Sequence, residues 1–579
     1  MNKIFKHKIL AGAMLFGFML AGSSCEDNVG IRVTPETPFA DKTLYEVVKN
    51  DPDLSDFLAV VDACGSECAD SLFNQARVYT LWAPVNDAVD EEALIAQAQV
   101  DREHVFRTFV LAHIANHTIP ANGTLDSDNT VMLLNKKLVH FTGNQKSGYT
   151  FSGVELDPQN TNIRVKNGLV HKIVKPSEYK YSIWEYLKIA EGVDSVAKYL
   201  YSFDVVEFNA GQSFPGPLNS DGEQTYIDSV FTTSNRWLTN WNGVGNIDNE
   251  DSTYIVYVPS NEMWNRMVAK AETYYKYNTK TSSSITEDDV IERDSLGKYY
   301  ARLNNLKYMT YSVNEQQYVE SADSAMPAYR DNTGKHAFFA KADIEENVIS
   351  EKELSNGVFK VVDAMPYSTI ALWHDTIFVE GEDNTWWNYS DKPGENTKEG
   401  ISFESVTKSN INGVDSTLQG AEVSGERYFW YQTESSTVTA KFRIPKVLSA
   451  KYYVAIIFVP ANITNERLDT ADLLGGKFRF TLKQGTNDLF KNTSNGSELY
   501  TKGRGIETLF LTNPDGSKAI IEPKFCEFFD GLEVETKDYT VTLDITTRGP
   551  SSDEKDQGLD FDRSIRIDKI MFIPVPEEE

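Results

Sequence analysis

The sequence has few of the residues and motifs that usually build a catalytic or metal centre. It contains 4 cysteines and 8 histidines, and no second pair of cysteines lies near the first, as a structural zinc site would need. It also lacks a His-Glu-x-x-His motif, a phosphate-binding loop and a dinucleotide fingerprint. The segment GQSFPG (Gly211 to Gly216) resembles a serine elbow but has Pro215 where that turn requires glycine. We therefore expect no enzyme; only a pair of catalytic carboxylates, which has no local signature, would escape this search.

Positive charge is scarce as well. The chain has 56 Lys and Arg against 85 Asp and Glu, which gives a formal net charge of -29. Nucleic acid is excluded as a partner on this basis, because its phosphates require a basic surface. The same charge disfavours adhesion to anionic lipid headgroups. Hydrophobic residues nevertheless make up 41% of the 579, enough for the packed cores of three or four domains.

The N-terminus carries an uncharged hydrophobic run, Ile9 to Ala21, that follows three lysines. This run is shorter than the roughly 20 residues that a membrane-spanning helix needs, so it favours a signal peptide. Cys25 follows a group of small residues, and the arrangement resembles a bacterial lipobox, in which the thiol is acylated. Gly22 departs from that pattern, which more commonly has leucine there. The alternative is ordinary cleavage near Ser24, with Cys25 left as a free thiol.

The residues after Cys25 indicate where such a lipoprotein would reside. Glu26 and Asp27 resemble the signal that sends some lipoproteins of Gram-negative bacteria to the outer face of the outer membrane. We therefore expect a signal peptide over residues 1–24 and a tether over residues 25–40. The acyl chains on one cysteine would hold the protein at the cell surface.

The other three cysteines are Cys64, Cys68 and Cys526. Export places them in an oxidising compartment, so Cys64 and Cys68 are candidates for a disulfide, and Gly65 between them would help the backbone bend. We expect Cys526 to be buried and unpaired.

Three pairs of similar segments indicate an internal duplication. The first pair predicts two short amphipathic helices, the second a strand ended by proline and followed by a helix cap, and the third a closing strand after an Asn-Gly turn. The pairs are TLYEVVKNDPDLSDFLAVV from Thr43 and SIWEYLKIAEGVDSVAKYL from Ser182, Tyr79 to Val89 and Tyr254 to Trp264, and Asn167 to Pro176 and Asn356 to Pro366.

This succession of segments resembles the fasciclin domain. The segment FVLAHIANHTI (Phe109 to Ile119) matches the histidine-bearing motif of that family, with His113 and His171 at its two typical histidine positions. The resemblance implies two α+β domains, over residues 41–179 and 180–368, that serve adhesion or interaction and have no catalytic activity.

The second copy departs from the pattern. Its segment LKYMTY (Leu306 to Tyr311) lacks a histidine, and Phe359 or Lys360 stands where the first copy has His171. It also carries an insertion between about Asp204 and Asp251 that is rich in Trp, Asn and Gly.

A metal site on one helix face is an alternative for the first copy. His113 and His117 are spaced four residues apart, but no third ligand of matched spacing follows. We therefore favour a hydrogen-bonded structural His113 and an exposed His117.

Residues 369–579 alternate apolar and polar side chains, which is typical of antiparallel strands in a β-sandwich or jelly roll. The strand candidates are Thr437 to Pro445, Tyr452 to Pro460, Lys477 to Leu482, Tyr539 to Ile545 and Arg566 to Val575. The last of them resembles the final strand of galactose-binding-like jelly rolls, a fold common among carbohydrate-binding modules.

Aromatic residues in this third of the chain are candidates for sugar contact. Trp386 and Trp387 lie in a polar loop, and Trp430 lies in the ring-rich segment RYFWYQT. Tryptophan among polar groups offers a stacking platform; the alternative is that one tryptophan of each group fills the core. The acidic loops Asn246 to Ser252 and Asp560 to Ser564 could hold structural calcium, but neither has a full EF-hand spacing, so solvated turns are favoured and no other cofactor is expected.

Lipoproteins with this three-part organisation resemble companions of starch-utilisation-type (SusC/SusD-like) outer-membrane transporters. The expected role is a non-catalytic accessory component of such a glycan-uptake complex, with the transporter and its surface glycan-binding lipoprotein as partners. The alternative is a stand-alone adhesion or carbohydrate-binding lipoprotein that contacts polysaccharide directly.

Overall fold

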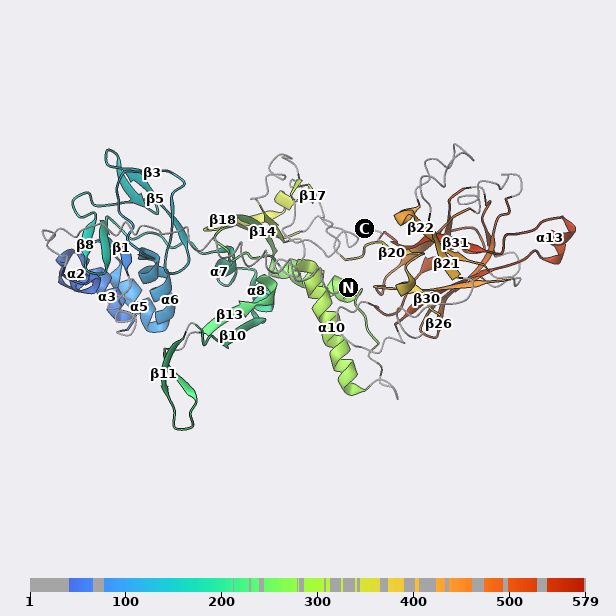
Figure 1. The fold of residues 1–579 in the computed structure, drawn as a ribbon, viewed down its shortest axis with the longest axis horizontal. Helices are drawn as coiled ribbons and strands as arrows, with labels where there is room; N and C mark the ends of the chain where they lie inside the picture. Colours follow the sequence, from blue (N-terminus) through green and yellow to red (C-terminus); the bar gives the residue numbers. More distant parts are fainter. Residues whose placement is uncertain are drawn as a thin grey trace, which may run out of the picture. The chain divides into compact units, whose positions relative to one another are not determined.

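The computed structural model describes residues 41–65, 78–211, 213–228, 231–238, 244–278, 280, 286–306, 309–312, 324–325, 339–340, 344–364, 373–389, 401–405, 423–432, 437–460, 473–492, 498–503, 505–527 and 539–576. The chain divides into two compact units, Met1–Lys180 (unit 1) and Tyr181–Glu579 (unit 2) (Figure 1). No helix within the described ranges is long and apolar enough to cross a membrane. The predicted signal peptide and tether lie outside these ranges.

Unit 1 combines short helices with a mixed sheet and several small antiparallel strands. Its elements are α2 (Leu44–Asn50), η1 (Pro52–Leu54), α3 (Ser55–Ala63), β1 (Tyr79–Pro84), α5 (Glu91–Val100), α6 (Arg102–Val105), η2 (Phe106–Val110), η3 (Leu111–His113), β2 (Ile114–Asn116), β3 (Thr124–Leu125), β4 (Thr130–Met132), β5 (Leu138–Asn144), β6 (Gly148–Phe151), β7 (Val154–Glu155), β8 (Ile163–Val165) and β9 (Gly168–Ile173). The main sheet has the order β2-β1-β9-β8, with β1 and β9 parallel.

Side-chain caps fix the helices of unit 1 to its sheet. Thr43 and Glu46 form a capping box at the start of α2. The side chain of Asn167 accepts a hydrogen bond from the Leu44 amide at 2.7 Å, and Asn86 accepts one from the Asp56 amide at 3.0 Å. These two asparagines hold α2 and α3 over one face of the sheet, where Leu44, Val48 and Phe57 are buried with other apolar residues.

The first part of unit 2 repeats this architecture. Its elements are α7 (Ile183–Leu187), α8 (Asp194–Tyr201), β10 (Asp204–Phe208), β11 (Phe214–Leu218), β12 (Gln224–Asp228), β13 (Phe231–Asn235), η4 (Arg236–Leu238), β14 (Tyr254–Pro259), α9 (Asn261–Glu272), α10 (Glu287–Leu306), β15 (Thr310–Ser312), β16 (Ser324–Ala325), β17 (Phe339–Ala340), β18 (Val348–Leu354) and β19 (Gly357–Val362). Its main sheet has the order β15-β14-β19-β18, again with the two central strands parallel.

The duplication extends to individual hydrogen bonds. Ser182 and Glu185 form the capping box of α7, as Thr43 and Glu46 do for α2. Asn356 accepts a hydrogen bond from the Ile183 amide at 2.9 Å, and Asn261 accepts one from the Ser195 amide at 2.8 Å. Both copies are therefore α+β domains built on the same pair of asparagines, as the repeated segments predict. We call them the first and second α+β domains.

The insertion in the second α+β domain forms two antiparallel strand pairs, β10 with β13 and β11 with β12. The Asn235 side chain anchors the base, because its amide donates to the Leu200 carbonyl at 2.9 Å and to the Asp204 carboxylate at 2.7 Å. Every residue of β10 is exposed.

The remainder of unit 2 is a β-sandwich. Its elements are β20 (Ile377–Glu380), η6 (Asn384–Trp386), β21 (Ile401–Ser405), η7 (Ser424–Glu426), β22 (Arg427–Tyr431), β23 (Thr439–Ile444), β24 (Tyr452–Phe458), β25 (Lys477–Gln484), β26 (Asn487–Lys491), β27 (Leu499–Tyr500), β28 (Glu507–Phe510), β29 (Ile520–Ile521), β30 (Val541–Thr547), α13 (Ser552–Asp556) and β31 (Ile565–Pro574). One sheet contains β21-β22-β31-β24-β28 with β20 and β29, and the other β23-β30-β25-β26 with β27. Alternate residues of β23 and β30 are buried between the sheets, which confirms the predicted period of two.

The sandwich and the second α+β domain share one hydrophobic core. The segment after α9 supplies Tyr274, Tyr275 and Tyr277 to the core of the sandwich. The backbone of this segment is also hydrogen-bonded to the sandwich: the Cys526 amide donates to the Lys276 carbonyl at 2.7 Å, and the Ser449 amide donates to the Tyr274 carbonyl at 2.9 Å. Unit 2 is therefore a single body, although its chain pattern changes near residue 368.

Candidate functional site

The structure places the cysteines as follows. Cys64 is buried at the end of α3, and Cys526 is buried with its Sγ 3.8 Å from the Tyr277 hydroxyl. Cys25 and Cys68 lie outside the described residues. Acylation of Cys25 and pairing of Cys64 with Cys68 stay predictions.

His113 is a fully buried residue at the end of η3, directly before β2. Its Nε2 accepts a hydrogen bond from the Ser177 amide at 3.0 Å, so the proton resides on Nδ1, which donates to the Phe109 carbonyl at 2.7 Å. Burial lowers the pKa of His113 to about 4. The ring is neutral at pH 7, and both of its nitrogens are bonded to the backbone.

His171 on β9 is buried on the face of the sheet away from the helices and carries the opposite tautomer. Its Nδ1 accepts from the Asn162 amide at 3.2 Å, and its Nε2 donates to the Ile119 carbonyl at 3.0 Å. The ring stacks on Trp82, with centroids 5.8 Å apart and planes 19° apart. Burial lowers the pKa of His171 to about 4 as well. Because both nitrogens of each histidine are occupied, either ring would have to give up one of these hydrogen bonds before it could ligate a metal or act as a base.

His117 does not share a helix face with His113. The helix ends at His113, β2 intervenes, and His117 is an exposed residue with a φ of 70°. The alternative of a two-histidine metal site on one helix is therefore wrong, because these two side chains belong to different elements.

Strand register identifies the counterparts of the two histidines in the second α+β domain. Tyr257 opposes Lys360 on β14 and β19, as Trp82 opposes His171 on β1 and β9. Lys360, not Phe359, therefore occupies the position of His171. Met309, which precedes β15 as His113 precedes β2, occupies the other position.

Lys360 brings a different chemistry to that position. Its Nζ lies 2.7 Å from Glu345 and 3.0 Å from Glu351, and the Tyr257 hydroxyl donates to Glu345 at 2.7 Å. Burial alone would lower the pKa of Lys360, but the two carboxylates outweigh it and raise the pKa. The second domain thus holds an ion pair where the first holds neutral rings.

The three candidate tryptophans do not form one surface. Trp387 is only 7% exposed, packs edge-on against Phe429, and its Nε1 donates to the Gly381 carbonyl at 2.8 Å. It fills the sandwich core, so its indole face is not a sugar platform in this structure. Trp386 is partly exposed and packs on the same core, whereas Trp430 belongs to a separate cluster with Val423, Tyr428, Val459 and Ile506.

One face of Trp430 is already covered. The Arg566 guanidinium lies 5.7 Å from the ring centroid and is held by Asp562 at 2.6 Å. The Trp430 Nε1 is buried and has no partner among the described residues. Sugar binding through Trp386 or Trp430 stays a prediction.

A carboxylate cluster in the sandwich was missed from sequence. Asp568 on β31 is 1% exposed and accepts a hydrogen bond from the Ser424 amide at 2.8 Å. Glu380 and Glu382 lie near it and each has a buried Oε2 without a partner in the described part of the chain. Burial raises the pKa of Asp568 to about 6 and raises the pKa of Glu382. No sequence signal could have joined these residues, because they meet only through the pairing of β20 with β31.

In each of the two acidic loops considered for calcium, one carboxylate is already bonded to protein groups. Asp562 accepts from the Ser564 amide at 2.9 Å and pairs with Arg566, and Asp248 accepts from the Ser182 hydroxyl at 2.7 Å. Within the described ranges no group of three or more His, Cys, Asp or Glu side chains is placed to hold a metal ion. Structural calcium stays untested.

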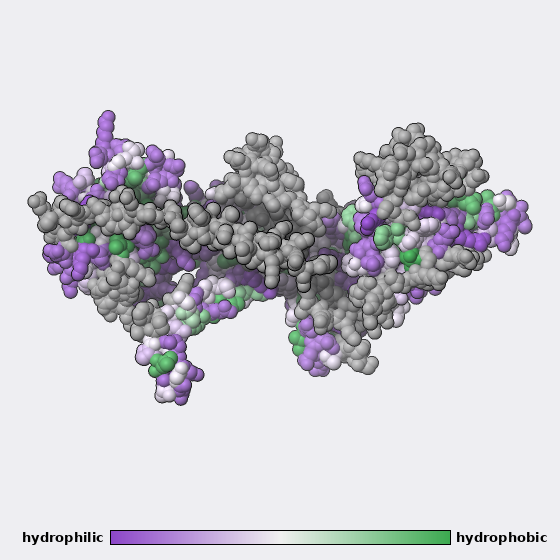
Figure 2. Space-filling model, in the orientation of Figure 1, coloured by the Kyte–Doolittle hydropathy of each residue, from purple (hydrophilic) through white to green (hydrophobic). Residues whose placement is uncertain are grey.

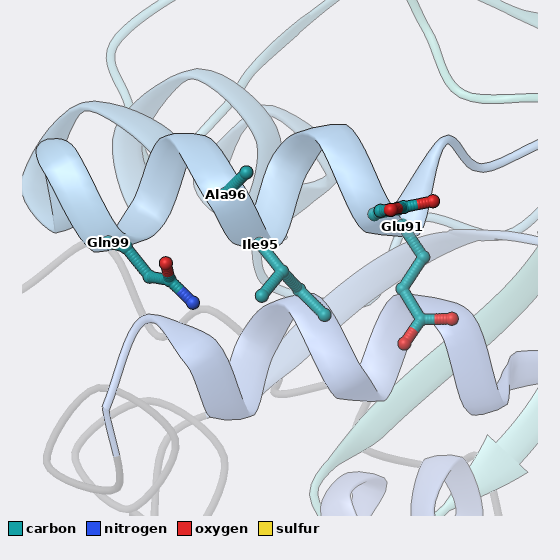
Figure 3. Close-up of a pocket in the computed structure, with 5 residues that line it drawn as sticks. Glu91, Ile95, Ala96 and Gln99 are labelled. Carbon is teal, nitrogen blue, oxygen red and sulfur yellow. The ribbon is translucent and has the colours of Figure 1, made fainter.

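A surface hollow of about 390 Å³ lies on α5 in unit 1. Ile95, Gln99 and Glu91 point from α5 toward the neighbouring helix (Figure 3), and α3 packs against α5. Glu92 and Ala96 complete the lining. The hollow presents two carboxylates and no cationic side chain.

No protein-family model and no curated protein matches the chain. Among solved structures, the chain is similar to a FAS1 domain pair of the insect cell adhesion molecule fasciclin I, at 14% identity and a TM-score of 0.20, over 55% of this chain and 98% of that one. It is also similar to an exo-beta-1,3-galactanase from Phanerochaete chrysosporium with galactose, at 10% identity and a TM-score of 0.17, over 34% of this chain and 29% of that one.

A third similar structure is an isomaltodextranase from Arthrobacter globiformis complexed with panose, at 13% identity and a TM-score of 0.18, over 37% of this chain and 25% of that one. At these identities and TM-scores none of the three assigns a function to the chain. The α+β fold of the two repeated domains follows from their own hydrogen bonds and strand order.

Proposed function

We propose that the chain is a non-catalytic lipoprotein of the outer-membrane surface that works by binding, as an accessory component of a SusC/SusD-like glycan-uptake complex. The observation that carries this proposal is Cys25, which directly follows a signal-like hydrophobic run and precedes acidic residues. Within the described residues the first helix begins at Leu44, and the proposed tether comprises the 16 residues 25–40 before it. Fully extended, such a tether reaches about 55 Å.

The internal chemistry of the α+β domains supports binding over catalysis. In the first domain both histidines are neutral and bonded to the backbone on both ring nitrogens. In the second domain the corresponding lysine is neutralised by Glu345 and Glu351. These groups stabilise their domains, and the proposed fasciclin-type adhesion role leaves recognition to the outer surfaces.

The anchor is tested with a Cys25→Ala variant and a matched Ser24→Ala control, which keeps the thiol and a small residue before it. We expect the control to fractionate with membranes and to carry acyl chains on Cys25 by mass spectrometry, and the Cys25→Ala variant to appear in the soluble fraction. Protease treatment of intact cells should digest the control. An unmodified thiol in the control would refute the lipoprotein.

The accessory role has its own test. Native pulldown of the anchored chain should recover an outer-membrane transporter and its glycan-binding lipoprotein in near-equal amounts. Recovery of the anchored chain without any transporter would refute the accessory role. It would not affect the conclusion that the chain is a lipoprotein.

The alternative function is direct binding of polysaccharide by the sandwich, and the observation that favours it is the partial exposure of Trp386 and Trp430. Affinity electrophoresis in gels that contain defined polysaccharides tests it, with Trp386→Ala and Trp430→Ala variants. Trp387→Ala is unsuitable as a binding probe because this side chain is part of the core. Equal mobility with and without every polysaccharide would remove this alternative.

A further inference from the structure

The strands β10 and β13, which we call the ribbon, expose an unusual amount of apolar surface. Val206 is 63% exposed, Phe208 42% and Phe231 61%. Strand register places these three side chains on one face, since Val206 pairs with Thr233 and Phe208 pairs with Phe231. We call them the apolar strip. Apolar and weakly polar surface is visible on this part of the molecule in Figure 2.

Aromatic contacts order the side chains of the ribbon. The rings of Phe208 and Phe231 pack edge-on with centroids 5.7 Å apart, and Tyr226 of β12 packs on Phe208 at 4.7 Å. At the base, Arg236 lies over Phe203 with its guanidinium 4.3 Å from the ring centroid. The strip is therefore held in place by aromatic contacts, although it is open to water.

Such a ribbon has only part of the usual protection of an exposed strand. Natural edge strands are commonly protected by charged side chains, above all lysine, by proline or by a covering element, because an open apolar edge attracts other strands; β10 has only the acidic residues Asp204 and Glu207. In the described part of the chain β10 pairs only with β13, and its sequence DVVEF contains neither lysine nor proline. An isolated two-stranded ribbon is also only marginally stable in water. Both facts indicate a surface that is covered when the protein functions.

The charge of the ribbon and its hairpin indicates what covers it. Residues 204–235 contain five acidic residues and no lysine or arginine; the acidic residues are Asp204, Glu207, Asp221, Glu223 and Asp228. Of these residues, Asp204 lies on the face of the apolar strip and the others belong to the opposite face or to the hairpin, so a partner that buries the strip approaches negative charge and complements it best with positive charge. A second copy of the chain fits poorly, because its ribbon would present the same five carboxylates.

We propose that the ribbon is a docking surface for a protein partner that presents apolar side chains flanked by lysine or arginine. The partner covers Val206, Phe208 and Phe231 with its apolar residues, and its flanking cations face Asp204, which strand register places on the same face; Glu207 lies on the opposite face with Val205. This interaction requires neither the lipid anchor nor a glycan, so it stands independently of the function proposed above.

A defined peptide tests the chemistry of this surface on the full chain. The probe is a fluorescent, end-blocked peptide in which lysine alternates with valine and phenylalanine, and its comparator has glutamate in place of lysine. Fluorescence anisotropy should show binding of the lysine peptide at least tenfold tighter than that of the glutamate peptide. Raising the salt from 50 to 300 mM should weaken it at least fivefold.

Matched variants assign the binding to the strip. The double variant Val206→Thr, Phe231→Thr should weaken binding of the lysine peptide at least tenfold, whereas Val205→Thr, on the opposite face of β10, should change it less than twofold. All three replaced side chains are at least half exposed, so the fold is retained and circular dichroism verifies this.

Three outcomes would overturn the proposal. The first is no binding of the lysine peptide at 1 mM, and the second is equal binding by the double variant and the parent. The third is a dimer in sedimentation velocity that the double variant abolishes, which would show that a second copy covers the ribbon.

Discussion

The two α+β domains share one frame of hydrogen bonds and differ in what lies on the far face of the sheet. In the first domain that face holds Trp82 and His171 within a buried aromatic cluster. In the second domain the same positions hold Tyr257 and Lys360, bonded to Glu345. The comparison teaches that the asparagine caps define the fold, whereas the far face can exchange neutral rings for an ion pair.

The buried cation also changes sides between the domains. In the first domain Lys172, next to His171, points to the helix side and pairs with Asp51 and Asp53 at 2.8 Å. In the second domain the residue that follows Lys360 is Val361, which is buried on the helix side. Each domain thus keeps one buried lysine on this strand, placed on opposite faces and neutralised by different carboxylates.

The largest expected difference between the two domains is their loss of stability in acid. The folded-state pKa of both His113 and His171 is about 4, below the 6.5 of the unfolded chain, so their contribution to stability is complete above pH 6.5 and is lost as the pH falls toward 4. At about 1.4 kcal/mol per unit, each histidine costs the first domain about 3 kcal/mol by pH 4. Hydrogen exchange at pH 7 and pH 4.5 should show loss of protection in β1 and β9 before β14 and β19. Simultaneous loss in both domains would contradict this.

Exchange of the two far-face residues should have the next largest effect. His171→Lys buries a charge beside Trp82 and Phe141, with no carboxylate placed to meet it among the contacts described, and should destabilise unit 1 by about 3–5 kcal/mol. The reciprocal Lys360→His keeps a group that Glu345 can bond, and should cost unit 2 about 1 kcal/mol. Urea unfolding followed by domain-resolved exchange measures both. Equal losses of unfolding free energy in the two variants would show that the far faces of the two sheets tolerate the exchange equally.

The sandwich should respond to pH with the opposite sign from the first domain. The pKa of Asp568 is raised from 3.8 to about 6, so the folded state holds a proton that the unfolded state has released between these values. Stability from this group therefore rises as the pH falls from 7 through 6, by about 3 kcal/mol at most. Asp568→Asn should flatten this rise in unit 2 when its unfolding is measured in urea between pH 7 and pH 5. An unchanged slope would mean that Asp568 does not titrate there.

The smallest effect should come from the shared caps, and it should appear in both domains. Asn167→Ala and Asn356→Ala each leave a buried backbone amide, of Leu44 or Ile183, without its acceptor. Each should cost about 1–3 kcal/mol. Thermal unfolding of the two variants checks this, with Asn50→Ala as the control, because its side chain bonds only an exposed carbonyl. Destabilisation of only one of the two domains would show that the asparagine caps are not equivalent.

The repeated frame could be predicted from sequence because it is local. Each half of it is a short segment, such as Tyr79 to Val89, in which strand, proline and asparagine follow one another, and β1 and β14 lie where these segments place them. The strands β23, β25 and β30 could be predicted equally well, because apolar and polar residues alternate along them. The type of sandwich connection, jelly roll or other, stays a prediction.

The sites were harder to predict because they depend on contacts between distant segments. Asp568 meets Glu382 only through sheet pairing, and the burial of Trp387 in place of its neighbour Trp386 is decided by which ring points into the sandwich. The core contributed by Tyr274 to Tyr277 gave no signal either, since a tyrosine-rich segment after a helix has no apolar period. The exposed ribbon follows from strand register, which the insertion's composition does not reveal.

The joint in unit 2 has a mechanical consequence. Ser449, Cys526 and Tyr539 contact the segment after α9 through hydrogen bonds and ring packing, so residues 274–277 are fixed to the sandwich. A force applied to the sandwich therefore passes through this segment to α9.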